Sequence, residues 1–468
     1  MAALSPALSP GRLQGLQALS RQLREPQRRE TTEESTFRDL LEILSGACRA
    51  LEQQSCQEGP YGLAGLHTCL QLVAESFRCL RNACVQCARN QHLLRNLGFI
   101  STSVHLIKLI HGMQSQEELS LTALRCSLQF LGNIAAGNGD SQDSLWKCAF
   151  PDLLLTCLSH GDQRVVSHTC TVLFSCLAPG RVRALLQPAG LPVALRVLGL
   201  CREQQQPDWP FLIVTEHLLR CPELVKALYA KLSNQERMTL LELMLAAVSE
   251  GSSASGEEPQ VWGSHAAFLA GCFQESCAAV LGLAAAPGAQ HEEALVVIRL
   301  LDVLCALSST PGQLEHLQAL PGLLCTAIDT LRLTHLAGKE AVNVFSANQA
   351  VTGQDEITHP AMGFKSHLIR LIGNLCYRNK ANQDKVFELD AIPLILDNCS
   401  IDDNNPFVSQ WAVLAIRNVT EQNERNQALI AGLEDQGLAQ SSALHSLGLE
   451  MERQEGRVLL KAARTEPS

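Results

Sequence analysis

The sequence predicts an all-α fold in which helical repeats stack side by side into an α-α superhelix (solenoid). Three observations support this class. Aromatic residues make up 4% and hydrophobic residues 46% of the 468 residues, apolar positions follow the helical period, and one order of helix, polar break, helix and proline recurs along the chain. Aliphatic residues without strand-like alternation favour helices that pack through Leu and Ala.

The clearest copy of the repeat is LIRLIGNLCYRNKANQDKVFELDAIPLILDNC, residues 368–399. Its first helix carries apolar residues at i, i+3, i+4, i+7 and i+8, which share one helical face: Leu368, Leu371, Ile372, Leu375 and Cys376. The break RNKANQ interrupts this pattern, and Val386 and Leu389 resume it. Pro393 fits the first turn of a third helix, where its missing N–H costs nothing.

An Asn within the apolar helix, followed eight and nine residues later by a polar pair, marks the other copies. The sets are Asn374 with Asn382 and Gln383, Asn418 with Asn426 and Gln427, Asn82 with Asn90 and Gln91, and Asn133 with Ser141 and Gln142. In two degenerate copies Ser175 and Val303 take the Asn place. The spacings fit a period of about 42 residues, which is typical of armadillo and HEAT repeats of two or three helices.

Two polar segments divide the array. Residues 251–260 and 334–362 are predicted to be loops, because neither can bury enough apolar surface to order itself. The predicted organisation is a mobile N-terminal tail at 1–30, N-terminal armadillo-like repeats at 31–250, central repeats at 261–333 and C-terminal armadillo repeats at 363–468. Residues 449–468 are expected to form an amphipathic helix that packs on the last repeat or on another subunit.

Charge and hydropathy exclude several function classes. The 37 basic and 47 acidic residues give a net charge of −10, and no basic stripe predicts nucleic-acid binding. We expect a cytosolic protein with no membrane span, because no segment reaches the ~18 apolar residues that a bilayer span needs and the N-terminus does not resemble a signal peptide. The 19 Cys residues lie on apolar helical faces, where buried, reduced thiols are expected.

Residues 363–438 resemble the C-terminal region of the ataxin-10 family, a divergent armadillo-repeat family. The similarity rests on GFKSHLIRLIGNLCYRNKANQDKVFELDAIPLILDNC, on NNPFVSQWAVLAIRNVTEQNERNQ, and on RCLRNAC at residues 78–84. Between about 150 and 360 it rests on repeat architecture alone. The resemblance implies a non-enzymatic scaffold whose C-terminal region, residues 363–468, mediates homo-association into a homo-oligomer, with a trimer as one stoichiometry.

The resemblance also implies roles and partners that composition and spacing do not show. The roles are neuron survival and neurite outgrowth (neuritogenesis) through Ras and MAP-kinase signalling, cytokinesis, and regulation of O-GlcNAc transferase. The partners are proteins: further copies of the chain, O-GlcNAc transferase and a G-protein β subunit. The implied location is cytoplasmic and perinuclear, extending to the midbody or centrosome.

The candidate protein-binding groove consists of four Asn residues and two neighbouring Arg residues: Asn82, Asn133, Asn374, Asn418, Arg81 and Arg417. In armadillo proteins an Asn at this place hydrogen-bonds the backbone of an extended peptide, so the alternative to the self-associating scaffold is a peptide-groove adaptor with an amide ladder on its concave face. The alternative is that each Asn caps or crosslinks helices, because a buried amide must be hydrogen-bonded.

Two further patterns bear on this groove. No Trp lies four residues before any ladder Asn, so binding of nuclear-import signals is not expected, and Trp411 is expected in the core. The polar pair, for example Asn382 and Gln383, is interpreted as N-cap chemistry for the following helix, with ligand contact as the alternative.

No catalytic, cofactor or metal site is predicted. The chain lacks Walker A, HExxH and GxSxG motifs, and the CxxC of Cys84 and Cys87 has no second pair to complete a tetrahedral site. A non-enzyme without cofactors is therefore expected, with an enzyme whose residues are dispersed over the repeats as the alternative class. Ser5 and Ser9 precede Pro residues and are candidate phosphorylation sites in the N-terminal tail.

Overall fold

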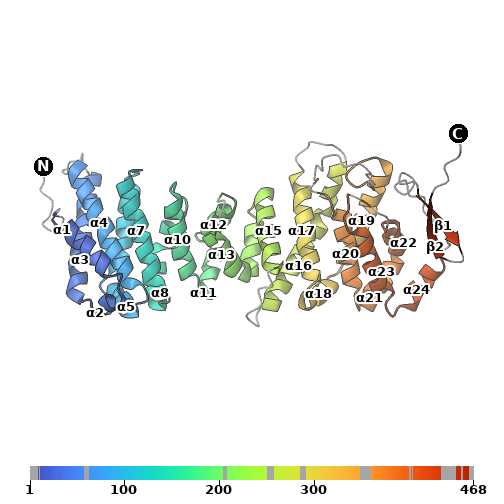
Figure 1. Cartoon of the computed structure of the whole chain (residues 1–468), viewed down its shortest axis with the longest axis horizontal. Helices are drawn as coiled ribbons and strands as arrows, with labels where there is room; N and C mark the ends of the chain where they lie inside the picture. Colours follow the sequence, from blue (N-terminus) through green and yellow to red (C-terminus); the bar gives the residue numbers. More distant parts are fainter. Residues whose placement is uncertain are drawn as a thin grey trace. The chain divides into compact units, whose positions relative to one another are not determined.

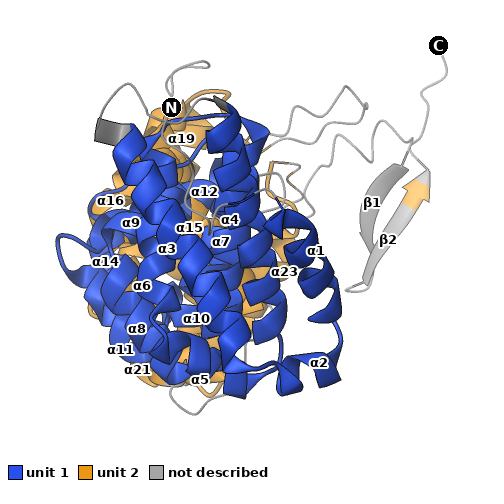
Figure 2. Cartoon of the chain, turned by 90° about the vertical axis from the view of Figure 1, so that its left-hand side faces the viewer, with its two compact units in different colours: residues 1–232 blue, residues 233–468 orange. Residues whose placement is uncertain are grey.

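The computed structural model describes residues 9, 11–56, 63–203, 208–249, 258–284, 291–347, 359, 361–399, 402, 404–433, 449–454 and 457–462. The chain forms two compact units, Met1–Leu232 and Ser233–Ser468, which Figure 2 distinguishes by colour.

Unit 1 is helical throughout its described residues. Its elements are α1 (Arg12–Gln22), α2 (Pro26–Thr31), α3 (Glu34–Cys56), α4 (Leu63–Cys84), α5 (Ala88–Asn96), α6 (Phe99–Gly112), α7 (Glu118–Ala135), α8 (Gly139–Ala149), α9 (Asp152–Leu158), α10 (Gln163–Cys176), α11 (Pro179–Val182), η2 (Arg183–Leu186), α12 (Leu191–Glu203), α13 (Asp208–Glu216), η3 (Leu218–Arg220) and α14 (Pro222–Tyr229).

Where the structure describes it, unit 2 is helical except for one pair of strands. Its elements are α15 (Asn234–Ser249), α16 (Glu258–Ser276), η4 (Cys277–Ala284), α17 (Glu292–Ser308), α18 (Pro311–Gln318), α19 (Leu323–Glu340), α20 (Phe364–Cys376), α21 (Lys380–Glu388), α22 (Ala391–Asp397), α23 (Val408–Thr420), α24 (Glu424–Ala431), β1 (Leu449–Gln454) and β2 (Arg457–Ala462).

Each unit is built from stacked helical repeats, which confirms the predicted all-α repeat class. The long helices α4, α7 and α10 contact one another in succession in unit 1, as do α17, α20 and α23 in unit 2 (Figure 1). Short helices such as α21 and α22 link one long helix to the next. The core lies between the layers, where Phe77, Phe99 and Phe130 are fully buried. The ring centroid of Phe130 lies 5.9 Å from that of Phe77 and 6.3 Å from that of Phe99.

The segment predicted as a mobile tail at 1–30 contains helices α1 and α2 instead. Leu16 and Leu23 are buried, and the Cys79 thiol of α4 donates to the Leu16 carbonyl oxygen at 3.3 Å. The leucines of GRLQGLQALSRQL fall on one helical face, so α1 covers the exposed side of α4 as a first, partial repeat. The Gly and Pro residues around this segment masked that period.

The predicted loop at 334–362 begins too early, because α19 continues to Glu340. Beyond it, Phe345 is buried, and the Ser346 hydroxyl donates to the carbonyl oxygens of Gly338 and Ala341 at 2.9 and 2.8 Å. The start of the segment therefore folds back on the end of its own helix. Of the other predicted loop, residues 258–260 belong to α16, and 251–257 lie outside the described residues.

The division between the compact units follows Leu232, earlier than the division predicted near residue 250. Helix α15 belongs to unit 2 because it packs against α17, and the Gln235 amide donates to a Glu292 carboxylate oxygen at 2.8 Å. The polar loop therefore lies inside a unit.

The C-terminal segment contains two strands, so the amphipathic helix predicted there is wrong for residues 449–454 and 457–462. The strands pair antiparallel, with Met451 opposite Leu460 and Glu450 opposite Lys461. The sequence LEMERQ alternates apolar and charged residues over its first four positions, and such a period of two suits a strand better than a helix.

One stretch, Gln260–Ala284, is long and apolar enough to span a membrane by length and composition, and three bent helix pairs meet the same criteria together. The test for spans covers the described residues only. Part of the apolar surface of the stretch packs against α17 and α18, where Ala266, Leu269 and Phe273 are fully buried. The expectation that no segment is long and apolar enough for a span is therefore wrong for this stretch, of whose most apolar window 28% is buried.

Candidate functional site

The four ladder Asn residues lie near the ends of the long helices, and each amide nitrogen donates to an earlier helix. Asn133 reaches the Arg81 carbonyl oxygen at 3.0 Å, and Asn418 reaches the Gly373 carbonyl oxygen at 3.0 Å. These two acceptors, Arg81 and Gly373, directly precede the ladder residues Asn82 and Asn374 of the previous repeats. A Cβ on Gly373 would lie 2.9 Å from the Cα of Ala415, so glycine lets α20 and α23 approach closely enough for this bond.

The other two ladder residues make the same kind of bond with different acceptors. The Asn82 amide donates to the Ser20 carbonyl oxygen of α1 at 2.8 Å, and the Asn374 amide donates to the Ser308 hydroxyl of α17 at 3.0 Å. Each ladder Asn lies two residues before the end of its helix, whereas α17 ends at Ser308, five residues after Val303. Val303 therefore does not occupy the ladder position that was predicted for it. Val303 is instead buried in the core.

The polar residues eight and nine positions after each ladder Asn also hold backbone carbonyls, except Ser141, whose buried hydroxyl has no hydrogen-bond partner among the described residues. The Asn382 amide donates to the Leu375 carbonyl oxygen at 2.8 Å. The Gln383 amide donates to the carbonyl oxygens of Asn418 and Glu421 at 2.9 and 3.2 Å. We call these residues the amide clasp: Asn90, Gln91, Gln142, Asn382, Gln383, Asn426 and Gln427. The clasp occupies carbonyl groups that the end of a helix leaves without partners.

The interpretation of the polar pair as N-caps is wrong by three residues. The N-caps are Asn379 and Asn423, whose side chains accept from the backbone N–H groups of Asn382 and Asn426 at 3.0 and 3.2 Å. The clasp residues therefore lie inside the first turn of the helix, and their Asn members reach back to carbonyl oxygens of the preceding helix. Asn423 also donates to the Gln383 side-chain oxygen at 3.4 Å, so cap and clasp of neighbouring repeats are joined.

Replacing Gln383 with alanine is expected to lower the free energy of unfolding by about 1–3 kcal/mol, because buried carbonyl groups of two repeats lose their donor. Gln427 is the matched control. It is exposed, and among the described residues its side chain donates only to the Thr420 carbonyl oxygen of its own repeat, so Gln427→Ala should cost less than about 0.5 kcal/mol. Urea denaturation followed by circular dichroism measures both values, and equal losses would contradict the role of the clasp between repeats.

The remaining predicted site residues have diverse surroundings. Arg81 donates to the Gln129 side-chain oxygen of α7, whereas the Arg417 side chain is exposed and makes no hydrogen bond or ion pair with any described residue. Trp411, expected in the core, is half-buried, and the Arg370 guanidinium lies 4.7 Å from its ring centroid. Ser5 lies outside the described residues, and the Ser9 carbonyl oxygen accepts from the Arg12 amide at the start of α1.

The cysteines are buried in most of the described positions. Cys84 and Cys376, which occupy equivalent places in the repeat, are both fully buried, and burial raises the pKa of each thiol. A thiol with a raised pKa is a poor nucleophile and a poor metal ligand. Within the described ranges, no group of three or more His, Cys, Asp or Glu residues is arranged to hold a metal ion.

Stacked three-helix repeats joined by amide contacts define the chain as an α-helical repeat protein of the solenoid class. Among solved structures, an engineered protein matches 87% of this chain and 95% of its own at 12% identity, with a TM-score of 0.35. A second solved chain comes from a study of a phosphorylation switch that controls the interaction between cadherin and beta-catenin. It matches 86% of this chain and 68% of its own length at 11% identity, with a TM-score of 0.33.

Sequence comparison is more specific. Ataxin-10 of Xenopus tropicalis is 51% identical over 96% of this chain and 92% of its own length, and ataxin-10 of Homo sapiens is 46% identical over 97% and 95%. An ataxin-10 homolog of Dictyostelium discoideum is 44% identical over 24% of this chain and 17% of its own. The family model described as "Spinocerebellar ataxia type 10 protein domain" matches residues 364–461. The chain belongs to the ataxin-10 family.

Proposed function

We propose that this chain is a non-enzymatic scaffold that binds proteins and associates with further copies of itself through its C-terminal repeats, residues 363–468. The observation that carries this proposal is a core position left uncovered on the last repeat. Five residues before the ladder Asn, α4, α7 and α20 carry Phe77, Leu128 and Ile369, which are 0–1% exposed. The equivalent residue of α23, Val413, is 67% exposed.

The polar contacts of the last repeat also support an unfinished stack. Gln383 donates to α23 and to the turn that follows it. Its equivalent, Gln427, has no such partner among the described residues. Phe407, at the start of α23, is 67% exposed as well. Large exposed apolar side chains are typical of protein-interaction surfaces where they gather, and we assign the surface around Val413 to a second copy of the chain.

The test is the mass of the full-length chain by light scattering. We expect the wild type to be larger than a monomer and Val413→Asp to shift the mass toward the monomer, because a carboxylate would be desolvated in the interface. Val85→Asp is the matched control: Val85 follows α4 in unit 1 and is 37% exposed, so its variant should keep the wild-type mass. A monomeric wild type, or an unchanged Val413→Asp variant, would remove the proposal.

Family membership supports finer assignments, which we propose for this chain as well. They are support of neuron survival and neurite outgrowth through Ras and MAP-kinase signalling, a part in cytokinesis, and regulation of O-GlcNAc transferase. The proposed partners are O-GlcNAc transferase and a G-protein β subunit. The proposed location is cytoplasmic and perinuclear, with the midbody or centrosome in addition. Binding of purified O-GlcNAc transferase to the purified chain tests the first partner directly.

The second candidate is a peptide-groove adaptor that uses the amide ladder. Asn374 favours it most, because its amide nitrogen donates to the Ser308 and Ser309 hydroxyls while its side-chain oxygen has no hydrogen-bond donor among the described residues. That oxygen is available to accept an N–H group of an extended peptide. The amide nitrogens of the other three ladder residues hold a backbone carbonyl of an earlier helix. Two of these residues, Asn82 and Asn418, are buried, which leaves less of the ladder for a ligand.

A further inference from the structure

The two strands β1 and β2 form a hairpin whose two faces differ in composition. In an antiparallel pair, residues directly opposite each other lie on the same face, and neighbours along a strand lie on opposite faces. The register therefore defines an apolar face made of Leu449, Met451, Val458, Leu460 and Ala462, with Arg453 beside the turn. It places on the charged face Glu450, Glu452, Gln454, Arg457, Leu459 and Lys461.

This hairpin needs a second layer. A hairpin of two strands is at most marginally stable in water, and it becomes stable when a further layer packs on its apolar face. Among the described residues of unit 2, no helix packs extensively against either strand. The apolar face of the hairpin therefore calls for a covering surface.

The surface around Val413 lacks a covering layer as well. A solenoid needs an end element with a polar outer face, because its last repeat otherwise exposes core positions. Helix α1 is such an element for unit 1, since Leu16 and Leu23 are buried whereas Arg12 and Gln17 are exposed. No helix does the same for α23, where Val413 is 67% exposed. The hairpin, apolar on one face and charged on the other, has the composition of an end element.

A second copy of the chain supplies the hairpin that fits this surface. Within a single chain Val413 stays exposed although the hairpin is present, so the chain's own hairpin leaves it uncovered. Residues 434–448 precede β1, and an extended segment of ~15 residues spans at most roughly 50 Å. Packed helices lie only about 8–10 Å apart, so a hairpin on this connection reaches the last repeat of a neighbouring copy.

We propose that the C-terminal hairpin of one copy packs its apolar face on the surface around Val413 of a second copy, so that each copy donates one hairpin and receives one. Exchange of an identical element between copies is a low-cost route to association. The charged face of the received hairpin then forms the polar end of the stack. The inference rests on the proposed self-association, and it names the segment of the partner copy that covers α23.

Leu459 and Leu460 are a matched pair for the test, because they are neighbours in β2 and lie on different faces. Leu460→Lys places an ammonium group where association would desolvate it, so the mass of the full-length chain by light scattering should fall to that of the monomer. Leu459→Lys places the same charge opposite Glu452, where it forms an opposite-charge pair, and should keep the wild-type mass. Both variants should keep the helical circular dichroism of the wild type.

Photo-crosslinking identifies the covering segment directly. Gln410 is exposed and lies three residues before Val413 on α23, so a benzoylphenylalanine in its place reports what lies on this surface without replacing Val413. Isotope-labelled and unlabelled full-length chains are mixed before irradiation, and mass spectrometry then separates crosslinks between copies from crosslinks within one chain. We expect crosslinks between copies that join α23 to residues 449–462.

These crosslinks, together with a monomeric Leu460→Lys and an unchanged Leu459→Lys, support the proposal. Crosslinks to the hairpin within one chain alone, crosslinks to a helix of the second copy, or an unchanged mass of Leu460→Lys would overturn it. In each of these cases a wild type larger than a monomer leaves the proposed self-association standing, so the hairpin and the scaffold function fail by different results.

Discussion

Leu375→Ala is expected to lower the free energy of unfolding by about 2–5 kcal/mol, the usual cost of emptying a leucine site in a packed core. Leu375 is fully buried on α20, and α20 contacts α17, α19 and α23. The cavity would therefore lie where several helices meet and where the surrounding side chains have little freedom to close it. Urea denaturation of the full-length chain, followed by circular dichroism, measures the loss.

Leu336→Ala provides the control for Leu375→Ala. Leu336 also lies in a helix of unit 2 but is 47% exposed, so the same truncation removes little buried surface and should cost less than about 1 kcal/mol. Comparable losses at the two positions would show that the apolar face of residues 368–376 has been assigned incorrectly.

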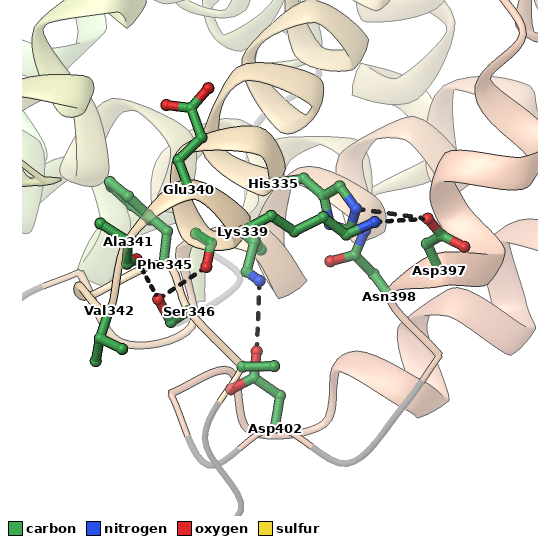
Figure 3. A pocket seen from close by; sticks show the side chains of 13 residues that line it. His335, Lys339, Glu340, Ala341, Val342, Phe345, Ser346, Asp397, Asn398 and Asp402 are labelled. Carbon is green, nitrogen blue, oxygen red and sulfur yellow. Dashed lines mark hydrogen bonds and ion pairs between the residues drawn. The ribbon is translucent and has the colours of Figure 1, made fainter. Parts of the chain in front are cut away.

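Asp402→Asn should destabilise the chain by about 3–5 kcal/mol, because it removes the partner of a buried charge. That charge is the Lys365 ammonium, which lies 3.5 Å from an Asp402 carboxylate oxygen (Figure 3), and the two side chains are only 4% and 5% exposed. Burial lowers the pKa of Lys365, and the charge of Asp402 partly offsets that effect. Without Asp402 the Lys365 ammonium stays desolvated and uncompensated. Differential scanning calorimetry or urea denaturation near pH 7 measures the change, and combining Asp402→Asn with Lys365→Met should recover much of the lost stability.

The pH dependence gives a second check on Asp402→Asn. The native state of the variant binds the Lys365 proton less tightly than the unfolded chain does, so its stability rises with pH between the native pKa and the unfolded value of about 10.4. The deficit relative to wild type should therefore shrink as the pH rises from 7 toward 10. A deficit that grows over this range would mean that the charge of Lys365 is not its cause.

The period of the repeat could be predicted from the sequence because it depends on core positions that only apolar side chains can occupy. Leu371 and Ile372 on α20, and the equivalent residues of other copies, must be apolar for the layers to pack. The ladder Asn is equally visible, since an amide within an apolar helix needs a buried partner. The fold class, the helix phase of residues 368–376 and the core location of Cys84 and Cys376 followed from these patterns.

The geometry of the site was not readable in the same way. Asn379, Asn382 and Gln383 lie within five residues of one another, and the sequence does not tell which of them precedes the first helical turn. The structure assigns the cap to Asn379, because only its side chain reaches a free N–H group of that turn. The sequence did hold one signal for the cap: Asn379, whose side chain can accept a hydrogen bond, lies three residues before the clasp residue Asn382. The partner carbonyls of Gln383 lie in the next repeat, and no local pattern reveals them.

The buried ion pair of Lys365 and Asp402 could not be predicted for a related reason. Lys365 lies at the start of α20 and Asp402 between α22 and α23, and no local pattern of residues shows that these two segments meet. Sequence periodicity reports which side of a helix is covered, but the point where two helix ends meet depends on tertiary packing.

The amide clasp makes each repeat depend chiefly on the next, in the manner of a one-dimensional chain with nearest-neighbour coupling. Gln383 joins only the repeats of α20 and α23, and Gln91 joins only those of α4 and α7, donating to the Asn133 and Ala136 carbonyl oxygens. Where α10 ends, Arg181 holds the Cys176 carbonyl oxygen instead. Arg181 also pairs with Asp143 of α8, and Gln142, the clasp residue of the α7 repeat, donates to the Ala135 carbonyl oxygen of that same repeat. No clasp amide therefore joins the repeats of α7 and α10 in the described part of the chain, so backbone hydrogen exchange should be faster at that junction, and opening should spread from it one repeat at a time.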